Sequence, residues 1–139
     1  MDGDWHDTIV RGDVAALEAR LHAGADVDAR DRHGQTGLML AAHHGHEDVV
    51  AVLVAAGAAL DVTAKYGLSA LMLAVVAGHE SCARRLADAG ADRTLRGSGA
   101  PGFAGKTAAD LAAARGSTEL ATRLALAGAP PARRSKDAQ

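Results

Sequence analysis

The chain has 139 residues, of which 48% are hydrophobic and 2% aromatic, and its formal net charge at pH 7 is −2. This length fits a single domain whose core must be built from alanine, leucine and valine, which favours closely stacked short helices over a sheet sandwich. The nearly neutral charge excludes a general attraction to nucleic acid or to an anionic membrane. Cys82 is the only cysteine, so an intramolecular disulfide and a multi-cysteine zinc site are excluded.

No segment reaches the roughly 18 continuous apolar residues that a membrane-spanning helix needs. The N-terminus, MDGDWHDTIVRGD, is acidic and lacks the positively charged start and apolar run of a secretory signal. We therefore expect a cytoplasmic monomer that does not interact with membranes.

The first segment, residues 1–30, introduces a repeat. Its glycines Gly12 and Gly24 recur 33 residues later as Gly45 and Gly57, and self-similarity at such a period is typical of stacked-repeat proteins. We interpret this segment as an altered first unit.

The start of this first unit, WHDTIV, is more polar than the later copies. It places His6, Asp7 and Thr8 where those copies carry the letters MLA. A terminal unit has one face without a neighbour, and that face must be polar, so we predict an N-terminal cap. Trp5 is predicted to pack over the first interface, with a partner-binding role as the alternative.

The central copies, residues 31–63 and 64–96, each predict the order turn, helix, helix and extended arm. The boundaries depend on capping hydroxyls and on glycines, which close helices in a left-handed conformation. In the two copies these residues are Gly34 and Gly67 in the turn, Thr36 and Ser69 at the first helix start, Gly45 and Gly78 at its end, and Gly57 and Gly90 after the second helix. Cys82 takes the place of Val49, so we expect a small buried side chain, with a redox or nucleophilic role as the alternative.

The period lengthens after residue 96. Gly67 and Gly105 are 38 residues apart, five more than the standard spacing, and the surplus falls in GSGAPG at 97–102. We predict a flexible loop that extends the third arm, either as part of a binding face or as a tolerated insertion. Phe103 follows the loop and is either its anchor or an exposed contact.

The last unit spans residues 103–129 and contains KTAADLA, with Asp110 where the central copies have Met39 and Met72. The remaining segment, PPARRSKDAQ at 130–139, is rich in proline and polar residues and lacks periodicity. We predict a disordered tail whose basic residues are either solvated or dock on an acidic surface.

The stretch GQTGLMLAAHHGHEDVVAVLVAAGA resembles the ankyrin repeat, whose pattern is G-x-TPLH-x-AA-x-x-GH-x-x-VV-x-L-L-x-x-GAD. KTAADLA likewise resembles the form common in last repeats. The chain departs from the pattern at the proline and histidine of TPLH, where it has Gly37 and Met39, then Ala70 and Met72. Losing the proline predicts lower local stability. The resemblance implies an all-α solenoid of about four units at roughly 1–30, 31–63, 64–96 and 103–129, with the first and last as caps.

The resemblance also implies a non-catalytic protein-binding module that uses its concave face and its arm tips. The corresponding inner positions of the first helices are Arg11, His43, His44, Val76, Ala77 and Arg115. The tip positions are Arg30, Arg32, His33, Gln35, Thr63, Lys65, Tyr66, Leu68, Arg96 and Lys106. Tyr66, with Leu68 beside it, is the best candidate for a binding hot spot.

The charges divide between these two sides. Cations predicted on the concave side are Arg11, Arg30, Arg32, Lys65, Arg96, Lys106 and Arg115, with Asp31 as a nearby exception. Acids predicted on the second helices are Glu18, Glu47, Asp48, Glu80, Asp88 and Glu119. We interpret this division as a basic inner face that attracts acidic partners, with ordinary solvated surface charge as the alternative.

Other functional classes have weaker support. The sequence has no GxSxG, GxxxxGK[ST] or HExxH motif, so neither an enzyme nor a cofactor is expected. His43 and His44 diverge on a helix and make a poor metal site, while His46 matches His79 as a packed residue of the repeat. Binding of nucleic acid or another polyanion stays open, although no reading motif or aromatic interleaving supports it. A structural solenoid without a dedicated partner cannot be separated from a binding module by sequence.

Overall fold

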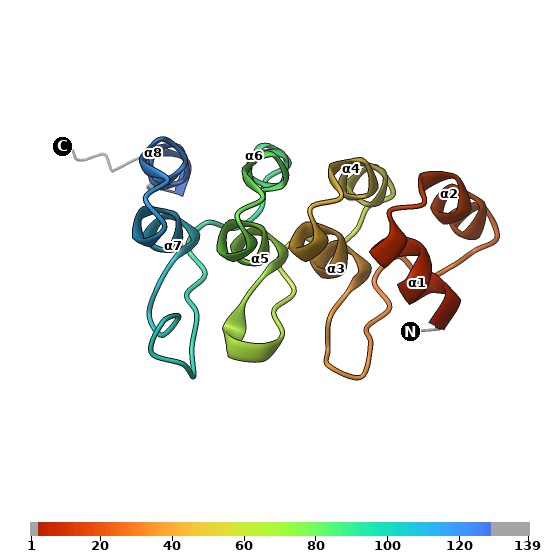
Figure 1. Cartoon of the computed structure of the whole chain (residues 1–139). Coiled ribbons are helices and arrows are strands. Elements are labelled where there is room, and N and C mark those ends of the chain that lie inside the picture. Colours follow the sequence, from red (N-terminus) through yellow and green to blue (C-terminus); the bar gives the residue numbers. More distant parts are fainter. Residues whose placement is uncertain (1–2, 129–139) are drawn as a thin grey trace.

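The computed structural model describes residues 3–128, and within this range the chain forms four helix pairs (Figure 1). The elements are α1 (Gly3–Arg11), α2 (Val14–His22), α3 (Gly37–His44), α4 (Glu47–Ala55), the 3₁₀ turn η1 (Lys65–Gly67), α5 (Ala70–Ala77), α6 (Glu80–Asp88), α7 (Ala108–Ala114) and α8 (Thr118–Gly128). The tail expected at 130–139 lies outside the described residues.

The helices form two rows. The first helices of the pairs, α1, α3, α5 and α7, pack side by side in one row, and α2, α4, α6 and α8 form the second. The connecting arms turn at tips that project from the first row, below it in Figure 1. This architecture confirms the expected all-α solenoid.

Polar caps and glycines set the helix boundaries as predicted. The hydroxyls of Thr36 and Ser69 accept the N–H groups three residues later, at 3.3 and 3.4 Å. Gly45 and Gly78 end the same helices at φ 76° and 83°, in the left-handed region that glycine adopts without a steric penalty. Each hydroxyl cap contributes about 1 kcal/mol to helix stability.

Between the two rows lies a core of aliphatic side chains with very little aromatic content. Its largest fully buried members are Ile9, Leu17, Leu38, Met39, Val49, Val50, Leu53, Leu71, Met72, Leu86, Leu120 and Leu124. Cys82 is also buried in the second row, and burial raises the pKa of its thiol. The interpretation of Cys82 as a small core residue is therefore supported.

Two aspartates link neighbouring arms. Asp28 Oδ1 accepts the N–H of Ala59 at 2.8 Å, and Asp61 Oδ1 accepts the N–H of Asp92 at 2.7 Å. The two bonds are one repeat apart, so they fix the same register between successive units.

The N-terminal unit caps the stack with Trp5, which is 3% exposed. Its packing role is as predicted. Gly37 is the first residue of α3 and lies under this cap, because a Cβ there would come within 2.6 Å of Ile9 Cδ1 and 3.4 Å of Trp5 Nε1. The side chains of the cap thus occupy the space where the family pattern has proline, which gives the departure at Gly37 a packing reason.

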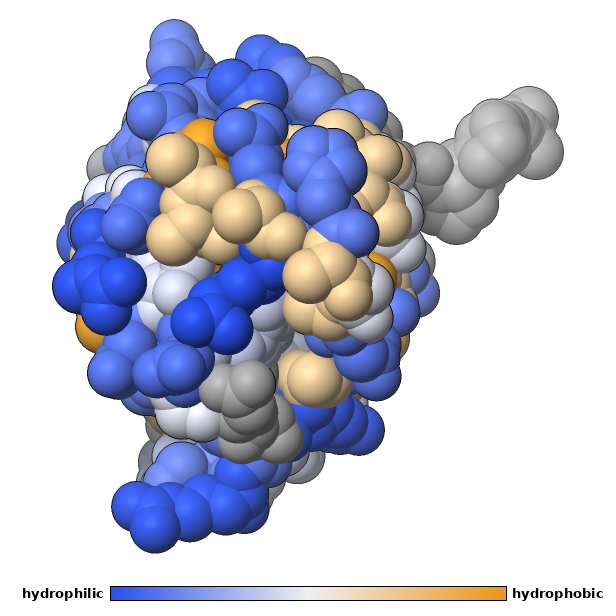
Figure 2. All heavy atoms as spheres, turned by 90° about the vertical axis from the view of Figure 1, so that its right-hand side faces the viewer, coloured by the Kyte–Doolittle hydropathy of each residue, from blue (hydrophilic) through white to orange (hydrophobic). Residues whose placement is uncertain are grey.

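The polar residues predicted on the outer side of the cap are not all exposed. Asp7 is exposed and His6 is half-buried, but Thr8 is 1% exposed. Thr8 tolerates burial because its hydroxyl donates to the Asp4 carbonyl at 2.7 Å. Figure 2 shows this end of the molecule, where most of the surface is hydrophilic and the hydrophobic colouring is mainly pale.

The insertion at 97–102, which we predicted as a flexible extension of the third arm, makes backbone hydrogen bonds to both of its neighbours. Gly97 donates to the Lys106 carbonyl and accepts from Gly105, both at 2.9 Å, and the Ser98 N–H donates to the Tyr66 carbonyl at 2.7 Å. The segment is therefore a hydrogen-bonded turn that packs on the preceding tip. Phe103 is half-buried and anchors it.

Helix α7 begins with a capping box. Thr107 Oγ1 accepts the Asp110 N–H at 3.2 Å, and Asp110 Oδ2 accepts the Thr107 N–H at 3.0 Å. That backbone N–H lowers the pKa of the Asp110 carboxyl, and the charges of Arg96 and Lys106 add to the effect. Asp110, which stands where the central units have methionine, thus caps the N-terminus of the last helix pair.

We predict that Gly37→Ala destabilises the protein by about 1 to 3 kcal/mol, since the added methyl group overpacks against Ile9. A strain-free glycine-to-alanine change in a helix has the opposite sign, by about 0.5 to 1 kcal/mol. Urea denaturation of the wild type and the variant distinguishes the two outcomes. Ile9→Val removes the clashing Cδ1, so Gly37→Ala should be better tolerated in that background. A stabilising effect of Gly37→Ala alone contradicts the packing explanation.

We predict that Asp110→Asn lowers stability at neutral pH by about 0.3 to 1 kcal/mol, because a carboxylate at a helix start is lost. The pKa of Asp110 is lower in the folded state than in the unfolded chain. Its contribution is therefore complete above the unfolded pKa and disappears as the pH falls through the folded pKa. Denaturation at pH 7, 5 and 3 should show the difference shrinking in acid. A constant difference contradicts the assignment.

Candidate partner-binding surface

The candidate residues lie on the first row of helices and on the tips, which together form one side of the stack (Figure 1). Most of them are accessible. The exposed members are Arg11, Arg30, Arg32, His33, His43, His44, Lys65, Tyr66, Arg96 and Arg115, while Gln35, Val76 and Lys106 are half-buried and Leu68 is buried.

Leu68 is a correction to the predicted hot spot. Its side chain is only 5% exposed and belongs to the core, so a partner cannot reach it. Phe103 takes its place beside Tyr66, with ring centroids 5.4 Å apart and planes at 39°. Sequence spacing missed this pair because the five-residue insertion lies between the two rings along the chain.

Two of the predicted tip arginines also hold the tips together. Arg30 donates from Nε to the Gly34 carbonyl and from Nη2 to the Thr63 carbonyl, both at 2.9 Å. Arg96 donates from Nη1 to the Gly105 carbonyl at 2.6 Å. These side chains therefore fix the scaffold as well as line the surface.

Histidine performs a similar function between the first helices. His46 Nε2 lies 2.7 Å from the Val10 carbonyl of the preceding unit, and a carbonyl can only accept, so this nitrogen is the donor. The ring of His79 packs equally closely on Gly45, where a Cβ would come within 2.6 Å of its Nδ1. The prediction that His46 is packed and hydrogen-bonded is confirmed.

The third junction replaces histidine with arginine. Ser117 stands where the other units have His46 and His79. Arg115 then donates from Nη1 to the Val76 carbonyl at 3.0 Å, from two residues earlier in the chain. Arg115 was predicted only as a partner contact, and the missing histidine was the sequence signal for its scaffold role.

The histidine cluster does not converge on a metal position. His43 and His44 have ring centroids 5.6 Å apart with planes at 76°, and His44 Nδ1 lies 3.0 Å from the Leu40 carbonyl. No group of three metal-ligating side chains occurs in the part of the chain that the structure describes.

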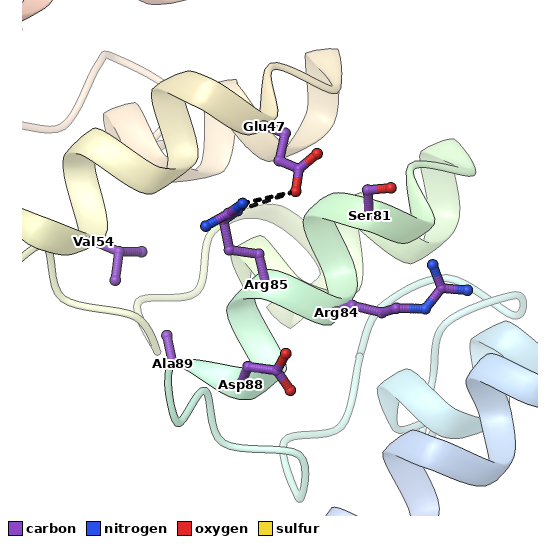
Figure 3. Close-up of a pocket in the computed structure, with 7 residues that line it drawn as sticks. All are labelled: Glu47, Val54, Ser81, Arg84, Arg85, Asp88 and Ala89. Carbon is purple, nitrogen blue, oxygen red and sulfur yellow. Dashed lines mark hydrogen bonds and ion pairs between the residues drawn. The ribbon is translucent and has the colours of Figure 1, made fainter.

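The second row carries cations that the sequence reading left out. They pair with the predicted acids. Across units, Arg85 pairs with Glu47 and Arg123 with Asp88, both at 3.0 Å, and Arg84 lies 3.9 Å from Glu119. Within α6, Arg84 also pairs with Glu80 at 3.2 Å. A pocket of about 440 Å³ lies between α4 and α6. Figure 3 shows the residues that line it, with the Arg85–Glu47 pair at its side. Its charged walls already pair with carboxylates or arginines, so it offers little unmatched charge to a ligand.

The cations of the first row and the tips have different hydrogen-bond partners from the cations of the second row. Arg96 and Arg115 bond to neutral carbonyls, which leaves their positive charge in place. Arg32 and Lys65 are exposed near them. Asp31 uses one oxygen for the N–H groups of His33 and Gln35, and Arg11 has a long contact of 3.8 Å to Asp13.

None of the helices within residues 3–128 is long and apolar enough to cross a membrane.

Comparison with known proteins agrees with this geometry. Residues 6–97 match the family described as ankyrin repeats in three copies. The chain belongs to the ankyrin-repeat family. The ankyrin repeat domain-containing protein 29 of Homo sapiens is 53% identical over 45 residues, which is 32% of this chain and 15% of that protein. The photoreceptor ankyrin repeat protein of Mus musculus is 45% identical over 47 residues, 32% of this chain and 12% of that protein.

We predict that Arg115→Ala lowers the free energy of unfolding by about 0.5 to 1.5 kcal/mol, because the Val76 carbonyl loses its donor. Adding Ser117→His should recover part of this loss by restoring the histidine of the other junctions. Arg32→Ala is the matched control, expected within about 0.5 kcal/mol of the wild type. Chemical denaturation of the four proteins provides the comparison. Equal effects at Arg115 and Arg32 contradict the scaffold role.

Proposed function

We propose that this ankyrin-repeat chain is a non-catalytic protein-binding module whose contact surface is the first row of helices together with the tips. The observation that carries the proposal is the difference in charge compensation between the two sides. Cations on the second row pair with carboxylates, whereas Arg96 and Arg115 meet carbonyls. A partner with acidic groups is therefore attracted to the inner side.

The surface is also physically suited to a protein partner. Its arms are tied to one another by Asp28, Asp61 and Arg30, so little conformational entropy is lost when a partner orders it. It spans all four helix pairs, which fits an extended protein contact better than a small substrate.

We predict that the double variant Arg32→Gln and Lys65→Gln loses a partner that the wild type captures from an extract of cells expressing the chain. The variant removes two positive charges from the inner side. A matched control, Ala15→Glu and Ala19→Glu, changes the net charge by the same amount on exposed positions of α2. Capture followed by mass spectrometry should show specific loss with the first variant only.

Equal capture by both variants and the wild type contradicts the use of the inner surface. Mobility shift with single-stranded DNA and RNA at low salt tests the polyanion alternative, because such binding is strongly salt-dependent. A shift that the first variant abolishes favours that alternative.

A further inference from the structure

The tip between α4 and α5, residues 63–69, carries an unusual aromatic side chain. Tyr66 is 36% exposed and is the one exposed large hydrophobic residue among the side chains that the structure describes. It is also the one non-glycine residue of 3–128 with a positive φ, at 63°. Such a conformation is disfavoured for a bulky residue and, where it occurs, points toward a functional position.

The sequence of this tip explains why its backbone differs from that of the tip between α2 and α3. In that preceding tip, Asp31 accepts the N–H groups of His33 and Gln35 and holds the turn. The corresponding residue in the tip between α4 and α5 is Ala64, whose side chain cannot accept those bonds. The turn becomes the 3₁₀ element η1 and directs Tyr66 outward.

The insertion then supports the ring of Tyr66. Phe103 lies against it, with centroids 5.4 Å apart. Gly99, at φ 79°, passes so close that a Cβ there would lie 3.3 Å from Tyr66 Cδ1. The Ser98 N–H donates to the Tyr66 carbonyl at 2.7 Å. The first two contacts hold the ring of Tyr66 and the third holds its backbone, so the aromatic side chain is positioned before any partner arrives, which is how rigid anchors gain affinity.

Positive charge surrounds this fixed ring. Lys65 Nζ lies 4.9 Å from the ring centroid of Tyr66. Arg96 precedes the insertion at 97–102 and Lys106 follows it. Both lie close enough to Asp110 to lower the pKa of its carboxyl. Asp110 directs one oxygen to the Thr107 N–H. This one carboxylate therefore lies near two of the three cations, Arg96 and Lys106.

From these contacts we infer that Tyr66, Phe103 and Lys65 form a recognition site, created by the insertion, for an acidic extended peptide segment that carries an aromatic or aliphatic side chain. The inference rests on the proposed function and specifies the chemistry of the partner. The apolar side chain packs on the exposed edge of Tyr66, and the flanking carboxylates meet Lys65, Arg96 and Lys106. A peptide fits better than a nucleic acid, since Phe103 and Lys65 already crowd the ring against base stacking.

Tyr66→Gly provides a direct test. Glycine adopts the observed φ without strain, so the variant should unfold at the same temperature as the wild type or higher, while the ring is lost. A phage-displayed library of random 12-residue peptides is selected on the full wild-type chain, and the enriched peptides are synthesised for titration. We expect Asp or Glu next to an aromatic or aliphatic residue, at least tenfold weaker binding to Tyr66→Gly, and binding to Tyr66→Phe within about threefold of the wild type.

Several outcomes overturn the inference. In the selection, these are enriched peptides without acidic residues or no enrichment at all. In the titrations, they are peptide binding to Tyr66→Gly within twofold of the wild type, or binding of oligo(U) that depends on Tyr66 in place of peptide binding. If a protein captured from extract is lost with Arg32→Gln and Lys65→Gln but kept with Tyr66→Gly, this inference fails and the proposed function stands. If neither variant changes capture, both fail.

Discussion

The close contact between neighbouring units is the constraint on which the rest of the structure depends. A single helix pair cannot bury its apolar sides alone, so each unit is stable only against the next. The contact is possible because Gly12 and Gly45 leave room for the rings of His46 and His79, where any Cβ would come within 3.0 Å. The aliphatic core and the 33-residue register both follow from this spacing.

The same constraint decides which polar residues remain available for function. Buried or interfacial groups must be hydrogen-bonded, and this chain meets the requirement in two ways. On the second row, arginines and acids of successive units pair with each other. On the first row and the tips, arginine and histidine side chains satisfy backbone carbonyls. Only the first solution cancels charge, so Arg96 and Arg115, which bond to carbonyls, keep their positive charge.

Sequence reasoning identified the features that repeat. The glycines, the caps at Thr36 and Ser69 and the packed His46 follow from local rules that act in every unit. It failed for residues whose role depends on contacts beyond their own stretch of the sequence. Leu68 was assigned to the surface because it corresponds to a tip position of the repeat pattern, although its side chain is buried in the core. Arg115 looked like a free inner cation, because its role depends on the absence of a histidine two residues later.

The departures from regularity are concentrated at the junction of the third and fourth units. There the period is longer by five residues, Ala64 replaces the turn-holding aspartate, and Arg115 with Ser117 replaces the interfacial histidine. The preceding junction shows that stacking needs none of these changes, since its helices pack in the same way with the regular residues. The tyrosine with its positive φ and the hydrogen-bonded turn beside it are therefore additions to a scaffold that is already complete, which is why we propose the recognition site at that end of the surface.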